Sequence, residues 1–173
     1  VSWARNVYKR QAELYPEHVK QIADAGHELA YHGYMHEAEV DMPAAEEEAN
    51  MEKSEKLLQS FANQKIVGYR GPLDLLPNCA LSLMEKRNYL YCSTLKDCDW
   101  AYVHEDYPIV ELPTEPSLDD FSFFYFSYAD EATITCSYPV DYVYDIWKDN
   151  FDELANEGDK VFVLKLHPQL IGR

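Results

Sequence analysis

Two histidines four residues apart are the side chains of this sequence best suited to chemistry. His32 and His36 stand in the run His-Gly-Tyr-Met-His, a spacing that places two imidazoles on one face of a helical turn. Imidazole nitrogen is a common metal ligand, so the pair is suited to a single metal ion. Gly33 favours this interpretation, because glycine lets the backbone turn sharply or approach a ligand closely. The run therefore predicts a metal site.

Four further candidates, Arg70, Asp97, Asp99 and His167, each follow or end a short run of strand length. In barrels of parallel strands the C-terminal strand ends meet on one face, so we expect these side chains and the histidine pair to share one site. An imidazole with an ordinary pKa near ~6.5 exchanges protons at neutral pH, which suits His167 to acid catalysis. Arg70 precedes Pro72 and follows a strand, which favours a site residue over a surface ion pair. Asp97 and Asp99 are equally compatible with turn residues and substrate contacts.

The elements that must position these side chains alternate between strands and helices. The expected strands cover residues 27–31, 65–69, 89–95, 109–112, 121–128 and 161–166. The expected helices are two short ones within residues 2–25 broken at Pro16, one that starts at Pro43 and buries Met51, Leu58 and Phe61, one capped by Asn78 that runs to Lys86, and one through Val143, Ile146, Trp147 and Leu154 that ends at Gly158. This order implies a parallel sheet, open or closed into a barrel, because parallel neighbours need crossover helices. The aromatic run at 121–128 favours core packing over a platform for stacking a sugar ring.

Composition limits the class of protein and its partners. A hydrophobic content of 47% over 173 residues predicts one domain over residues 1–173 with a continuous core. The 31 acidic and 15 basic side chains give a formal charge of -16, which makes nucleic acid and anionic membranes poor partners. No apolar run is long enough to span a bilayer. The four cysteines contain no CxxC pair, which favours reduced thiols and a cytoplasmic protein. The aromatic content is compatible with a homo-oligomer.

Several collinear segments resemble the motifs of a known family. The segments YPE at 15–17, AGHELA at 25–30 and HGYMHE at 32–37 resemble the second signature of the polysaccharide deacetylases, the NodB-like carbohydrate esterases. GYRGP at 68–72 resembles the family's arginine and proline motif, and LKLHPQ at 164–169 its last histidine motif. The segments STL at 93–95, VELP at 110–113 and LDDF at 118–121, with Asp99 and Tyr102, resemble the branch of allantoinase-like and peptidoglycan deacetylase-like members.

The resemblance implies a fold, a ligand set and catalytic roles. It implies an α/β fold, a distorted (β/α) barrel of the NodB type, with a divalent metal held by His32, His36 and one aspartate. It implies that His167 is the catalytic acid and that Arg70 orients the aspartate that acts as base. The substrate contacts that we expect are Tyr34, Pro72, Asp99 and Tyr102. The family's first motif, an Asp-Asp pair, has no match, so we expect the third metal ligand upstream of Val1 and a domain that lacks its first strand and its C-terminal end.

Our first hypothesis is a hydrolase that uses zinc or a similar divalent ion to remove an acyl group from an amide nitrogen, acting on an N-acetylated sugar or a small amide. An amide carbonyl is a poor electrophile, so a Lewis acid that polarises it and activates water supplies both partners of the attack. A second hypothesis is the opening of a cyclic amide or ureide, possible without metal, as in the allantoinase-like branch. Activity that survives chelation would favour this second reaction. A third is a binding domain that has lost catalysis.

Overall fold

The structure, a computed structural model, describes residues 4–7, 9–62, 64–129, 132–135 and 137–171. The chain divides into two compact units. The first contains residues 1–95 and 102–112, and the second contains residues 96–101 and 113–173.

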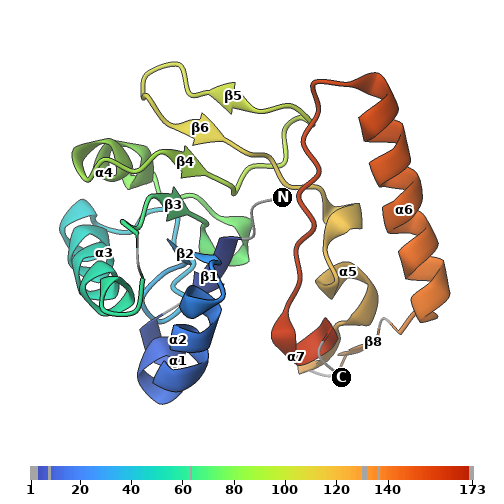
Figure 1. The fold of residues 1–173 in the computed structure, drawn as a ribbon, viewed down its shortest axis with the longest axis horizontal. Coiled ribbons are helices and arrows are strands. Elements are labelled where there is room, and N and C mark those ends of the chain that lie inside the picture. The colour runs from blue at the N-terminus through green and yellow to red at the C-terminus, as the bar shows by residue number, and fades with distance from the viewer. Residues whose placement is uncertain (1–3, 8, 63, 130–131, 136, 172–173) are drawn as a thin grey trace. The chain divides into compact units, whose positions relative to one another are not determined.

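The first unit is built on a six-stranded sheet, whose strands follow one another in the order β1-β2-β3-β4-β6-β5 (Figure 1). The strands are β1 (Ala4–Val7), β2 (Glu28–Tyr31), β3 (Gly68–Tyr69), β4 (Tyr91–Cys92), β6 (Val110–Glu111) and β5 (Tyr102–Val103). All neighbouring pairs are parallel except β5 and β6. The sheet formed by the described residues is not closed, so the predicted parallel arrangement is present as an open sheet.

Helices connect the parallel strands of the first unit and supply its core. They are α1 (Lys9–Leu14), α2 (Pro16–Asp24), α3 (Ala44–Gln59), the 3-10 turn η1 (Pro72–Asp74) and α4 (Ala80–Lys86). Pro16 occupies the first turn of α2, where its missing N–H costs nothing. Met51 and Leu58 of α3 are fully buried in one hydrophobic cluster with Leu29 of β2 and Met84 of α4. The predicted stripe is therefore confirmed for Met51 and Leu58, whereas Phe61 lies after the end of α3 and is only partly buried.

The second unit contains the longest helix of the described chain, α6 (Val140–Glu157), which ends at Gly158 with a φ of 74°. Its other elements are η2 (Pro116–Leu118), α5 (Phe121–Phe124), the antiparallel hairpin of β7 (Phe126–Ala129) and β8 (Ala132–Thr135), and α7 (Pro168–Ile171). The indole nitrogen of Trp147 donates a hydrogen bond to the carbonyl of Ser117 at 3.1 Å, which ties α6 to η2. None of the helices in the described part of the chain combines the length and apolar content that crossing a bilayer requires.

Three of the expected elements differ from the observed ones. Residues 4–7 were expected to be helical and form β1 instead, because they pair in parallel with all four residues of β2. Residues 121–124 were expected to be a strand and form the short helix α5, whose first backbone N–H, that of Phe121, donates to the Asp119 carboxylate at 2.9 Å. Residues 161–166 form no strand beyond one isolated bridge between Lys165 and Asp119. At residues 4–7 pairing with a distant strand outweighs intrinsic propensity.

The expected helix cap at Asn78 is also wrong. Cys79 occupies the N-cap position of α4, and no side chain caps the helix. The side-chain amide of Asn78 donates instead to the Asp41 carboxylate at 2.9 Å. A long-range partner has replaced the local one.

Candidate active site

The C-terminal ends of β2 and β3 bring His32 into contact with Arg70. His32 Nδ1 donates a hydrogen bond to the backbone carbonyl of Arg70 at 2.9 Å, since a carbonyl oxygen can only accept. This bond fixes the neutral tautomer whose lone pair lies on Nε2. Burial lowers the pKa of His32 to about 4, so the ring is neutral at physiological pH. A neutral imidazole held through its second nitrogen by a carbonyl is the form in which histidine binds metals.

His36 completes a pair of imidazoles with His32, but the backbone between them is not the expected helical turn. The two ring centroids lie 5.0 Å apart with planes at 83°. Gly33 and His36 have φ values of 76° and 66°, in the left-handed region. The segment is thus a loop that reverses sharply after β2. The prediction that the rings are neighbours is confirmed, and the prediction of a helical turn is wrong because the loop is shaped by contacts outside it.

Those contacts come from Glu37 and Pro72. Glu37 Oε2 accepts hydrogen bonds from the backbone N–H groups of Tyr34 and Met35, both at 2.8 Å. A Cβ atom added to Gly33 would lie 2.9 Å from Cγ of Pro72 and 3.1 Å from Glu37 Oε2. Gly33 is therefore required twice, for its positive φ and for the close approach of its neighbours. Pro72 thus lies directly against the loop of residues 32–37, the histidine loop.

A third metal ligand for His32 and His36 is not found beside them in the described residues. Among these residues, only Asp119, Asp120 and His167 bring three potential ligand atoms within 4.8 Å of one another. The aspartate that the family resemblance implies upstream of Val1 stays a prediction. The donor set of two imidazoles, one with its tautomer fixed, fits zinc or a similar ion.

His167 lies in the second unit, held by a buried aspartate. Its ring Nδ1 lies 2.6 Å from Asp120 Oδ1, and its backbone N–H donates to Asp120 Oδ2 at 2.8 Å. Asp120 is fully buried, and its neighbour Phe121 packs its ring 5.1 Å from the imidazole. The carboxylate orients the ring and places a proton on Nδ1, which leaves the lone pair on Nε2. The pair has the geometry of a proton donor with its orienting partner.

Asp119 adds a second carboxylate to the pair of Asp120 and His167, so the three side chains together are a candidate metal site. Asp119 Oδ2 lies 2.7 Å from the ammonium of Lys165, and its Oδ1 accepts from the Phe121 N–H. Each of the four carboxylate oxygens of Asp119 and Asp120 thus already has a donor. The Lys165 charge would also repel a cation. These contacts favour proton transfer over metal binding at this cluster. The sequence motif LDDF at 118–121 contains both aspartates, but it did not predict their contact with His167.

The other predicted site residues are distributed between both units. Tyr34 lies in the histidine loop with the Lys53 ammonium 5.2 Å from its ring centroid, and Tyr102 packs its ring 5.4 Å from that of His104. Asp99 belongs to the second unit, where it pairs with Lys160 at 2.8 Å, and this contact lowers its pKa. Their expected contacts with substrate stay predictions.

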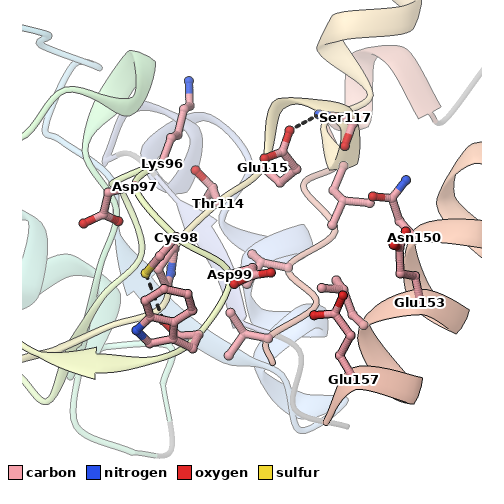
Figure 2. Close-up of a pocket in the computed structure, with 16 residues that line it drawn as sticks. Lys96, Asp97, Cys98, Asp99, Thr114, Glu115, Ser117, Asn150, Glu153 and Glu157 are labelled. Atoms are coloured by element: carbon pink, nitrogen blue, oxygen red, sulfur yellow. Dashed lines mark hydrogen bonds between the residues drawn. The ribbon is translucent and has the colours of Figure 1, made fainter. Parts of the chain in front are cut away.

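Asp97 and Asp99 line a depression of about 550 Å³ in the second unit (Figure 2). Glu115, Glu153 and Glu157 line it as well, together with Lys96, so its lining is predominantly acidic. Lys160 partly neutralises it through Asp99 and through Glu157 at 3.3 Å. All residues that line the depression belong to the second unit, and neither Asp120 nor His167 is among them.

The aromatic run at 121–128 is not core in its described part. None of the residues of α5 is buried, and the rings of Phe121 and Tyr125 stack with centroids 3.9 Å apart. The side chains of residues 126–128 lie outside the described ones. Because the ring of Phe121 packs beside His167, at least one of these aromatic residues belongs to the candidate site.

Comparison with known proteins identifies the family. Residues 6–91 match the family model described as polysaccharide deacetylase. This chain belongs to the polysaccharide deacetylase family. The resemblance in the sequence motifs is thereby confirmed, and the match contains the histidine loop and Arg70.

Similar proteins cover nearly all of this chain. The peptidoglycan deacetylase-like protein FGM2 of Gibberella zeae is 26% identical over 196 residues, which cover 92% of the chain and 57% of the relative. The peptidoglycan deacetylase of Helicobacter pylori is 29% identical over 188 residues, which cover 93% of the chain and 64% of the relative. The crystal structure of a protein from Mycobacterium smegmatis, described as a polysaccharide deacetylase, is 31% identical in sequence, with a TM-score of 0.89. The match covers 100% of this chain and 60% of the Mycobacterium smegmatis chain. The α/β deacetylase fold is confirmed, and the chain spans less than two thirds of the length of these relatives.

Proposed function

We propose that the chain carries catalytic residues of a metal-dependent hydrolase that removes the acetyl group from the amide nitrogen of an N-acetylated sugar. The observation that carries the proposal is the hydrogen bond from His32 Nδ1 to the Arg70 carbonyl, which prepares a neutral imidazole beside His36 for a metal. The names of the two peptidoglycan deacetylase relatives support the substrate class. We also propose that the two units form one catalytic domain.

In this proposal His32 and His36 hold a divalent ion, with zinc preferred because imidazole nitrogen suits it. The ion would polarise the amide carbonyl and lower the pKa of a bound water. His167 donates the proton from Nε2 that the departing amine requires, while Asp120 keeps the ring oriented. Arg70 orients an aspartate base, and Tyr34, Pro72, Asp99 and Tyr102 contact the substrate.

The test combines metal binding with acetate release from N-acetylated chitooligosaccharides and peptidoglycan, using the full-length protein. His32→Ala is expected to abolish stoichiometric Zn²⁺ binding and activity. His167→Ala is expected to retain zinc and lose about 10²-fold or more in kcat, as for loss of a general acid. His18→Ala, at an exposed position of α2, is the matched control and should change neither. Zinc binding that is indifferent to His32→Ala, or full activity in His167→Ala, would refute the proposal.

A further inference from the structure

Glu111, the last residue of β6, is a fully buried carboxylate at the C-terminal edge of the sheet. Its Oε1 accepts hydrogen bonds from the backbone N–H groups of Thr94 at 2.7 Å and Leu95 at 2.9 Å. Its Oε2 lies 3.0 Å from Nε2 of His104. A buried carboxylate is costly unless donors surround it. Two of these contacts come from the segment that follows β4, residues 93–95, so Glu111 fixes the backbone of that segment.

The same segment, residues 93–95, binds the side chain of Arg70 through Ser93. The Arg70 guanidinium donates from Nε to the Ser93 carbonyl at 2.8 Å and from Nη2 to the Ser93 hydroxyl at 2.6 Å. The Ser93 hydroxyl in turn donates to the carbonyl of Leu112, the residue after Glu111, at 2.7 Å. Thr94 Oγ1 accepts from the backbone N–H of Gly71 at 2.9 Å. Both the side chain of Arg70 and the backbone that follows it are therefore attached to residues 93 and 94.

The chain of contacts ends at His32, because the Arg70 carbonyl accepts from His32 Nδ1. We propose that Glu111 is a positioning residue for His32, acting through Ser93, Thr94 and Arg70. This inference rests on the proposed function, in which His32 binds the metal. Every contact in it lies within the first unit and among the described residues.

The Glu111 carboxylate strengthens the hydrogen bonds that it accepts, in addition to filling its position in the core. Hydrogen bonds to a carboxylate are roughly twice as strong as those between neutral groups. Glu111→Gln keeps the shape but offers one neutral oxygen and an NH₂ group, which weakens the hold on Thr94 and Leu95. Loss of a hydrogen-bonded partner behind a metal ligand costs about tenfold or more in metal affinity. We therefore expect about a tenfold rise in the Kd for Zn²⁺ in Glu111→Gln.

The experiment measures Zn²⁺ binding by titration calorimetry and the imidazole ¹⁵N and ¹H signals of His32 in the metal-free protein. In the wild type we expect His32 to show one tautomer, with the proton on Nδ1. In Glu111→Gln and in Ser93→Ala this tautomer is expected to lose population, with a similar rise in Kd. The double variant should be no weaker than about tenfold, since both changes interrupt one path, whereas independent effects would multiply to about 100-fold.

Glu28→Gln is the matched control, because Glu28 starts β2 at the opposite strand end and accepts from the Tyr91 hydroxyl at 2.9 Å. It should leave the His32 signals unchanged. An unchanged His32 tautomer in Glu111→Gln overturns the inference even when the wild type hydrolyses N-acetylated sugars. A shifted tautomer supports it even when the wild type hydrolyses none, so the two proposals fail separately. If Glu111→Gln does not fold, Ser93→Ala tests the same path, and unchanged signals in that variant also overturn the inference.

Discussion

The pairing of Asp120 with His167 predicts a large effect from the smallest possible change, Asp120→Asn. The carboxylate accepts two hydrogen bonds from His167, one from the ring and one from the backbone, and is fully buried. An amide offers one acceptor oxygen and one NH₂ donor in the same space, so one donor of His167 faces another donor. An unsatisfied buried group costs about 1–3 kcal/mol. Since about 1 kcal/mol shifts Tm by about 2–4 °C in a chain of this size, a cost of about 1–3 kcal/mol lowers Tm by about 2–12 °C.

The assay is thermal and urea unfolding of the wild type and Asp120→Asn, with His167→Ala and the double variant completing a cycle. The ring contact predicts a coupling free energy of about 1 kcal/mol or more between the two positions. Asp152→Asn is the matched control, because Asp152 pairs with Lys148 on an exposed face of α6 and should contribute little. Equal Tm values for Asp120→Asn and Asp152→Asn, or a coupling near zero, would show that the pair does not orient His167.

Three further substitutions test the histidine loop and the buried side chain of Glu47. Burial raises the pKa of Glu47, so the folded state binds the proton more tightly than the unfolded state, and the free energy of unfolding should fall as pH rises above about 4.5. Glu47→Gln should remove this fall and leave the free energy of unfolding below about pH 4.5 unchanged, which chemical unfolding over this pH range would measure. In urea unfolding, Gly33→Ala should lower the free energy of unfolding by about 1–3 kcal/mol more than Gly26→Ala does. Both glycines have a positive φ, but only a Cβ at Gly33 would meet Pro72, so equal losses would show that this contact is unimportant. Glu37→Ala frees two backbone N–H groups of the loop and should weaken Zn²⁺ binding in calorimetry, and wild-type affinity would show that the loop is held by other contacts.

The sequence by itself determined the elements whose signals are local. The stripe of Met51 and Leu58 predicted α3 and its buried side, because apolar spacing and helical period agree. Gly158 predicted the end of α6, because a left-handed C-terminal residue favours glycine. The spacing of His32 and His36, with Gly33 between them, predicted neighbouring imidazoles, since four residues of backbone cannot separate two rings widely when the chain turns.

Tertiary structure decided everything that depends on partners distant in the sequence. Residues 4–7 became a strand because β2 lay available for pairing, and the histidine loop followed Glu37 and Pro72 instead of helical dihedrals. His167 acquired Asp120 from 47 residues away, and His32 acquired the Arg70 carbonyl from 38 residues away. The donor of a carboxylate or carbonyl depends on position in space, and a single sequence carries no record of which distant residues folding brings within 3 Å of one another.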